Sequence, residues 1–223
     1  MISTGVQLAL WLAGAAALVS LASWIGFRSY RRFAIASRGA VTMALAPGGP
    51  VTPLDALLDP LEAAHPGQTG LANLLINQDA FAARAVSAAA AGRSLDLMSY
   101  IWSTVITGWL LIADLLAAAD RGVRVRLLLD DVNVQGFDPA FLALNQHPNV
   151  EVRLFNPIRN RGHVIRRTLE LLLGLSRFNR RMHGKMWLAD GRVAITGGRN
   201  VGDTYFGATA GGKRMSRDAD VIV

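Results

Sequence analysis

The sequence predicts an α/β fold with a mixed, largely parallel β-sheet flanked by helices, preceded by an N-terminal transmembrane helix. Three observations predict it. The first 27 residues carry no charge and are mostly apolar, strand-like and helix-like patterns alternate after residue 71, and Pro- and Gly-rich sequence separates the two regions. We therefore divide the chain into a transmembrane anchor or signal segment (1–28), a linker (29–70) and a globular domain (71–223).

The N-terminal segment is long enough to cross a bilayer, since about 20 apolar residues span its core as a helix. It is followed by a basic flank with arginines at positions 28, 31, 32 and 38. By the positive-inside rule, the globular part is expected in the cytoplasm. A cleaved export signal is the main alternative, although no Lys or Arg precedes the apolar run and the run is long for a signal. A buried helix of a soluble domain is the third reading.

The residues after the membrane segment read as a linker, since residues 47–70 are rich in Pro, Gly and Ala. A short helix over Leu54–Ala64 fits inside it. The alanine-rich stretch Asp79–Ala91 predicts a helix that ends at Gly92.

Strands and helices then alternate. Ser94–Trp102 reads as a strand, Gly108–Gly122 as an amphipathic helix, and Val123–Asp131 as a buried strand that ends in two carboxylates. A short helix and a strand over Val150–Phe155 follow. This β-α-β-α-β order is typical of a parallel sheet, because a helix carries the chain back between strands.

The C-terminal part predicts a basic helix over Val164–Phe178 and two short strands that meet at Gly191. The chain then ends on the apolar run DADVIV (Asp218–Val223) without a turn or a cap. A buried strand needs partners on both sides, so this ending favours a domain truncated at its C-terminus.

Composition favours an anionic partner. The chain has 23 Lys and Arg against 16 Asp and Glu, a formal charge of +7 and a sequence pI of about 10.9. Nucleic acid, an acidic membrane and phosphate-bearing substrates all fit this charge. Cysteine is absent, which excludes disulfides, thiolate metal sites and a cysteine nucleophile.

The candidate chemistry lies near the C-terminus. His183 and Lys185 are one residue apart, so on an extended chain they point to the same face. Gly197 and Gly198 permit a tight turn that brings Asn200 to the same edge. The imidazole can attack phosphorus while the ammonium and amide hold the oxygens where charge develops, so no metal or other cofactor is required. Each residue alone reads as an ordinary surface or turn residue; their ordered spacing argues for a site.

That spacing is H-x-K, four residues, D, six residues, G-G-x-N, and it resembles the HKD signature of the phospholipase D superfamily. The flanking sequence is similar to the first half of bacterial cardiolipin synthases that carry two HKD motifs. The resemblance covers roughly Ala64–Val223, and it rests on the runs HPGQTGLANL, SLDLMSYIW, LLAAADRGVRVRLLLDDVN, HPNVEVRLFNP, NRRMHGK, ITGGRNVGDTYFG and DADVIV.

The resemblance implies a phospholipase D-like sandwich and a role for five residues. His183 matches either the histidine that forms a phosphohistidine or the one that acts as acid and base. Lys185 and Asn200 match the phosphate-binding pair, and Asp190 matches the motif's aspartate, to which we give a supporting role. Asp218 lies where the family often has an acid that orients the histidine.

Weaker signals surround this motif. Many relatives have Ser where this chain has Gly198, which removes a hydroxyl donor. Tyr100 and Trp102 line either a substrate cleft or the core, with the core favoured. Asp130 and Asp131 are expected to order a loop rather than bind a metal. An arginine cluster suits anionic lipid headgroups or simply a solvated helix face; it comprises Arg159, Arg161, Arg166, Arg167, Arg177, Arg180 and Arg181.

The implied activity is a membrane phosphatidyltransferase that makes cardiolipin or a related phospholipid through a phosphohistidine. The implied location is the bacterial inner membrane, and the implied partners are an anionic phospholipid and the membrane. The alternative is a phosphodiesterase or nuclease of the same superfamily, which the apolar N-terminus disfavours. The sequence holds one HKD motif, so we expect the second from a missing C-terminal half or, less favoured, from a homodimer partner. An inactive half-site is the remaining reading.

Overall fold

A computed structural model describes residues 3–46, 48–103, 105–134, 136–209 and 215–223. The chain forms two compact units. We call residues 1–42 with 156–180 the helical unit, and residues 43–155 with 181–223 the sheet unit.

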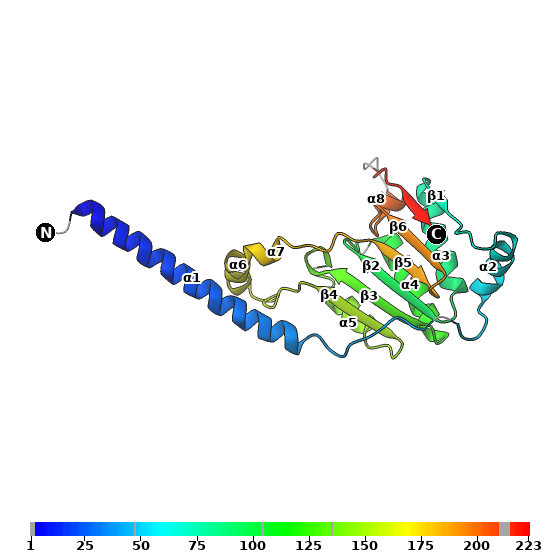
Figure 1. The fold of residues 1–223 in the computed structure, drawn as a ribbon, viewed down its shortest axis with the longest axis horizontal. Coiled ribbons are helices and arrows are strands. Elements are labelled where there is room, and N and C mark those ends of the chain that lie inside the picture. Colours follow the sequence, from blue (N-terminus) through cyan, green and yellow to red (C-terminus); the bar gives the residue numbers. More distant parts are fainter. Residues whose placement is uncertain (1–2, 47, 104, 135, 210–214) are drawn as a thin grey trace. The chain divides into compact units, whose positions relative to one another are not determined.

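The sheet unit is built on one seven-stranded sheet with the strand order β1-β7-β6-β5-β2-β3-β4 (Figure 1). Its strands are β1 (Ala72–Leu74), β2 (Ser94–Ser99), β3 (Arg124–Asp130), β4 (Val150–Phe155), β5 (Met186–Ala189), β6 (Val193–Gly197) and β7 (Asp220–Ile222).

The predicted mixed sheet is confirmed, but its description as largely parallel is wrong. Parallel pairing joins β2 to β3 and β3 to β4, whereas the other four neighbouring pairs are antiparallel. The reason lies in the connections. The strands β2, β3 and β4 are separated by helical crossovers, but β5 and β6 are joined by a turn in which Asp190 and Gly191 have φ of 53° and 71°. A turn this short permits only an antiparallel pair.

Strand β7 also has neighbours on both sides, β6 and β1. One of these neighbours, the short strand Ala72–Leu74, was not predicted and falls at the border of the predicted linker.

Helices cover the sheet and complete the core. They are α2 (Pro53–Ala64), α3 (Asn77–Ala90), α4 (Ile106–Asp120), α5 (Asp138–Leu144) and α8 (Asp203–Phe206), with a 3₁₀ turn η1 at Asp131–Val134. Helices α3 and α4 lie against one face of the sheet (Figure 1). Alternate residues of β3, namely Val125, Leu127 and Leu129, are fully buried there, as the two-residue period of a strand requires.

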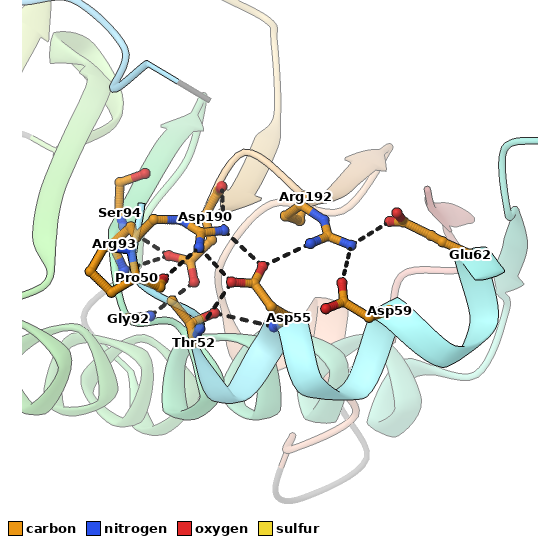
Figure 2. Close-up of polar contacts among 10 residues, drawn as sticks. All are labelled: Pro50, Thr52, Asp55, Asp59, Glu62, Gly92, Arg93, Ser94, Asp190 and Arg192. Atoms are coloured by element: carbon orange, nitrogen blue, oxygen red, sulfur yellow. Dashed lines mark hydrogen bonds and ion pairs between the residues drawn. The ribbon is translucent and has the colours of Figure 1, made fainter. Parts of the chain in front are cut away.

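Helix α2 falls inside the predicted linker, yet it is attached to the sheet unit. Its N-cap Thr52 and Asp55 form a capping box. The Asp55 carboxylate lies between Arg93, at 2.8 Å from Nη2, and Arg192, at 2.9 Å from Nη1 (Figure 2). The hydrogen bonds from Arg93 and from the Thr52 backbone hold the pKa of Asp55 well below its usual range, even though burial acts in the opposite direction.

The helical unit consists of α1 (Thr4–Ala36), α6 (Val164–Leu173) and α7 (Leu175–Phe178). Helix α1 has no buried residue, and among the described helices it is the one that is long and apolar enough to cross a membrane. It continues eight residues beyond the predicted membrane segment 1–28. The helix predicted over Val164–Phe178 is interrupted at Gly174, where a Cβ would lie 2.8 Å from the carbonyl oxygen of Glu170.

Candidate active site

The sheet brings four predicted site residues to one edge. Met186 at the start of β5 pairs with Met98 near the end of β2 and with Thr196 near the end of β6. The end of β6 pairs in turn with the start of β7. His183 and Lys185 immediately precede β5, Asn200 follows β6, and Asp218 precedes β7. Antiparallel pairing therefore gathers these four residues at the same edge of the sheet.

His183 and Lys185 are in contact. The Lys185 Nζ lies 3.3 Å from Nδ1 of His183 and donates to the His183 carbonyl oxygen at 2.9 Å. The pair stands directly before β5 rather than inside the strand. His183 is exposed, whereas Lys185 is buried. The arrangement presents an imidazole to solvent and places a fixed cation beside it.

The surroundings of Lys185 act on the pKa of its ammonium in opposite directions. Burial lowers the pKa of the Lys185 ammonium, and the nearby Asp218 carboxylate partly offsets that effect. Asp218 lies two residues before β7 instead of within it, and it is half-buried. A Cβ on Gly198 would lie 2.4 Å from the Asp218 Oδ1. The glycine at this position therefore leaves room for a carboxylate close to Lys185.

Tyr100 lies beside His183 and Lys185, contrary to the favoured core interpretation, whereas Trp102 belongs to the core. The Tyr100 ring centroid lies 4.6 Å from that of His183, and Lys185 Nζ lies 5.3 Å from the same Tyr100 centroid. An aromatic face within this distance of an ammonium is favourable. Trp102 is only 1% exposed, as the core interpretation predicts. The two aromatic residues follow one strand but point to different environments.

Asn200 holds the loop after β6 against the end of β2. Its Oδ1 accepts a hydrogen bond from the Ile101 backbone N–H at 3.1 Å, and its Nδ2 donates to the Tyr205 hydroxyl at 3.0 Å. An amide nitrogen carries two N–H groups. One N–H of Asn200 is therefore used by Tyr205.

Asp190 lies at the opposite end of β5 from Lys185. Its carboxylate accepts hydrogen bonds from the backbone N–H groups of Gly92, Arg93 and Ser94 at 2.9, 2.7 and 2.9 Å (Figure 2). The structure therefore does not bring Asp190 to the edge that carries His183. These contacts fit the supporting role that we assigned to it, because they join the β5–β6 turn to the start of β2.

Asp130 positions the segment that carries His183. It is fully buried, and its carboxylate accepts hydrogen bonds from Arg181 Nη1 at 3.2 Å and from the Met182 backbone N–H at 3.1 Å. The described residues contain no cluster of three or more metal-ligating side chains. Loop ordering, the favoured reading of this carboxylate, is what its contacts show. The sequence did not indicate which loop it orders.

A buried ion cluster that was not predicted from the sequence lies at the same edge. Asp220 is 1% exposed, bonds to Arg84 Nη2 at 2.8 Å and accepts from the Arg199 backbone N–H at 3.1 Å. Burial lowers the pKa of Arg84, and Asp220 partly offsets this. The only indication of this cluster in the sequence is that Asp220 stands between apolar residues in the final strand. An acid in that position is typical of a buried partner for a cation.

Comparison with known proteins places these features in a family. The family model described as "Cardiolipin synthase, PLD-like domain" matches residues 87–222. The chain is 50% identical to "Cardiolipin synthase C" of Escherichia coli (strain K12) over 163 residues, which cover 73% of this chain and 33% of that protein. It is 33% identical to "Cardiolipin synthase" of Geobacillus kaustophilus (strain HTA426) over 93 residues, covering 42% of this chain and 16% of that protein.

A solved structure shares the fold. The phosphatidylserine synthase of Haemophilus influenzae Rd KW20 superposes with a TM-score of 0.50 and 12% sequence identity, covering 69% of this chain and 32% of that one. The match to the Escherichia coli protein spans about a third of its length. The family model, by contrast, matches well over half of this chain, and the HKD spacing lies inside the match. The chain belongs to the cardiolipin synthase family with a PLD-like domain.

Proposed function

We propose that this chain supplies one HKD half of a phospholipase D-type phosphatidyltransferase that makes cardiolipin or a related phospholipid. The observation that carries the proposal is the contact between the exposed His183 imidazole and the buried Lys185 ammonium, 3.3 Å apart. His183 can act as a nucleophile or a proton carrier, and Lys185 beside it is a fixed cation. Asn200 lies at the same edge of the sheet. Membership of a family described by cardiolipin synthesis supports the choice of substrate.

The chemistry proceeds in two displacements at phosphorus. In the first, an imidazole nitrogen bonds to phosphorus, the bond from phosphorus to the donor's headgroup oxygen breaks, and a second histidine protonates the departing alcohol. In the second, that histidine takes the proton of an acceptor alcohol, whose oxygen displaces the imidazole. Lys185 and the free N–H of Asn200 hold the non-bridging oxygens, where negative charge develops.

A second HKD half is part of this proposal. It comes from the remaining length of a longer protein or from a second copy of this chain. His183 takes one of the two histidine roles. An acceptor that is another phospholipid gives cardiolipin, whereas water as acceptor would give hydrolysis.

The apolar helix α1 favours a lipid substrate over a nucleic acid. It is 33 residues long with no buried residue, so its apolar surface needs an apolar environment. An anchor of this kind keeps the enzyme at the surface that carries its substrate. With arginines following the apolar run, we place the enzyme in the bacterial inner membrane with its catalytic part in the cytoplasm.

The test is phosphatidyl transfer with a trapped intermediate. The chain is expressed alone and with a second HKD half, and each preparation receives phosphatidylglycerol labelled in the headgroup and in the acyl chains. We expect cardiolipin with release of free glycerol, and acyl label trapped on a histidine after a rapid quench in denaturing detergent at neutral pH, because the phosphorus–nitrogen bond is labile to acid. Locating the label on a His183 peptide assigns this residue as the nucleophile; locating it on the partner histidine assigns His183 as the acid.

The control variant is His65→Ala, since His65 is exposed and lies at the end of α2, away from the site edge. It should leave transfer unchanged, whereas His183→Ala should abolish it. Cardiolipin formation that persists in His183→Ala would refute the proposal. Cleavage of DNA without any phosphatidyl transfer would favour the nuclease instead.

A further inference from the structure

A cavity of about 560 Å³ lies within the helical unit, between the C-terminal part of α1 and the segment 156–180. We call it the α1–α6 groove. Its apolar wall includes Trp24 and Phe27 from α1 and Leu169 and Leu173 from α6. All of its lining residues belong to the helical unit, so it is distinct from the HKD site of the sheet unit.

The lining of the groove is also basic. Arg159, Arg166 and Arg177 line it together with one acid, Glu170, which leaves an excess of positive charge. Although burial alone would raise the pKa of Glu170, hydrogen bonds from Arg159, Asn160 and Arg177 lower it below its usual value. Glu170 is therefore ionised at neutral pH, and it neutralises only part of the arginine charge.

Arg177 is fixed in place but incompletely paired. Its guanidinium stacks 3.2 Å from the Tyr30 ring centroid and 3.7 Å from that of Phe178, and its Nη2 lies 3.3 Å from Glu170 Oε1. Its Nη1 is buried and has no hydrogen-bond partner among the described residues. A buried N–H without an acceptor is costly. Arg177 also lines the groove, so a small shift of its guanidinium would bring this N–H within reach of an anionic oxygen there.

The groove lies where α1 changes from apolar to basic. The uncharged run ends at Phe27, and Arg28 is the first charged residue. A bilayer core takes about 20 of the 33 helical residues, so about a dozen extend beyond it. Trp and Tyr favour the level of the lipid headgroups, and Trp24 and Tyr30 both line the groove. A helix inserted in this way holds the groove at headgroup depth.

The outer side of α6 is also suited to a lipid surface. Val164, Ile165 and Leu172 are 81%, 77% and 60% exposed, on a helix whose remaining positions include Arg166 and Arg167. Exposed apolar residues beside arginines are typical of a helix that lies in a membrane interface. Phospholipid is therefore the ligand that surrounds the groove when the protein is in its membrane.

We propose that the α1–α6 groove binds one anionic phospholipid, with its phosphate against Arg166 and Arg177 and an acyl chain along Trp24 and Leu169. The site is additional to the HKD site, and its occupation does not depend on phosphatidyl transfer. Its role is to recruit and retain an anionic lipid beside α1.

The test measures lipid retention by the full chain. Protein purified in non-ionic detergent is incubated with equal amounts of phosphatidylglycerol and phosphatidylcholine that carry the same acyl chains, and retained lipids are counted by native mass spectrometry. Phosphatidylglycerol is expected to be retained in preference. Arg166→Gln should lower its retention about fivefold. Arg167→Gln removes the same charge from the next residue of α6, which does not line the groove, and should leave retention unchanged.

A steric pair gives an independent readout. Gly26 lines the groove, and a Cβ placed on Gly26 or Gly14 would meet no atom within 4 Å. Gly26→Leu is therefore expected to fill the groove and reduce phosphatidylglycerol to the level of phosphatidylcholine. Gly14→Leu, on the same helix but outside the groove, should have no effect.

Lys185→Met separates this site from the HKD site. Retention that persists in this variant supports the groove even if the proposed transferase activity fails, whereas loss of the lipid would assign the retained molecule to the HKD site and overturn the proposal. If Arg166→Gln and Arg167→Gln lower lipid retention equally, general surface charge explains the retention, and the proposal is overturned. Displacement of the lipid by millimolar inorganic phosphate would also overturn it, because it would identify a phosphate site.

Discussion

Replacing Asp190 tests whether the aspartate of the HKD motif acts through folding rather than through chemistry. Its carboxylate binds three consecutive backbone N–H groups at the start of β2, at 2.7–2.9 Å. It lies at the far end of β5 from Lys185. Asp190→Ala removes all three hydrogen bonds without touching the site edge.

The expected loss of stability follows from these contacts. A hydrogen bond to a charged group contributes about 1.5–3 kcal/mol when it is well buried. Here only the Ser94 end is buried, while Gly92 is exposed, so water replaces part of the lost bonding; we expect about 3 kcal/mol for the three together. Asp190 also has φ of 53°, which costs alanine about 1 kcal/mol more. The total is about 4 kcal/mol, or a fall in Tm of roughly 10 °C.

Asp190→Asn provides the graded comparison. Asparagine tolerates the left-handed backbone, and its one carbonyl oxygen can still accept from Arg93 and Ser94. It cannot accept from Gly92, because an amide N–H₂ then faces that backbone N–H. We expect about half the loss of the alanine variant.

The assay pairs urea unfolding with the specific activity of the folded protein, measured well below the unfolding transition. Both Asp190 variants should be destabilised but retain turnover per folded molecule. Lys185→Met should show the reverse, with stability retained and turnover lost. An Asp190→Asn variant that is as stable as the parent and yet inactive would refute this reasoning.

Three other contacts can be tested by pH or by substitution. Because bonding to Arg93 depresses the folded pKa of Asp55, the stability that ionised Asp55 contributes is fully present above about pH 4 and is lost as the pH falls through the folded pKa. Asp55→Asn should therefore flatten the acid limb of a plot of Tm against pH, and an unchanged limb would contradict this. Asp130→Ala removes the acceptor that holds the segment before His183, so kcat should fall on the order of 10²-fold with KM nearly constant. Unchanged turnover would show that Asp130 does not position His183. Gly198→Ser must displace Asp218, and the loss of this nearby carboxylate should lower the Lys185 pKa further. The alkaline limb of the pH–rate profile should therefore move to lower pH. A limb that does not move would show that Asp218 does not stabilise the ammonium.

Much of the fold could be predicted because local patterns determine it. Apolar alternation gave the strands β3 and β4, and glycines marked helix ends and the β5–β6 turn. Parallel pairing was overestimated because the β-α-β pattern at 94–155 was extended to strands that are joined by short turns. The strand Ala72–Leu74 was missed because three residues are too few to establish a period.

The HKD spacing indicated the superfamily and the pair His183 and Lys185, and the flanking sequence narrowed the resemblance to the cardiolipin synthases. Only the tertiary structure decided what the neighbours of this pair do. Antiparallel pairing of β5 with β2 places Asp190 far from the pair and Tyr100 beside it. Asp130 contacts a segment about 50 residues further along the chain. Contacts at this separation depend on strand order and register, and no local spacing in the sequence records either of them.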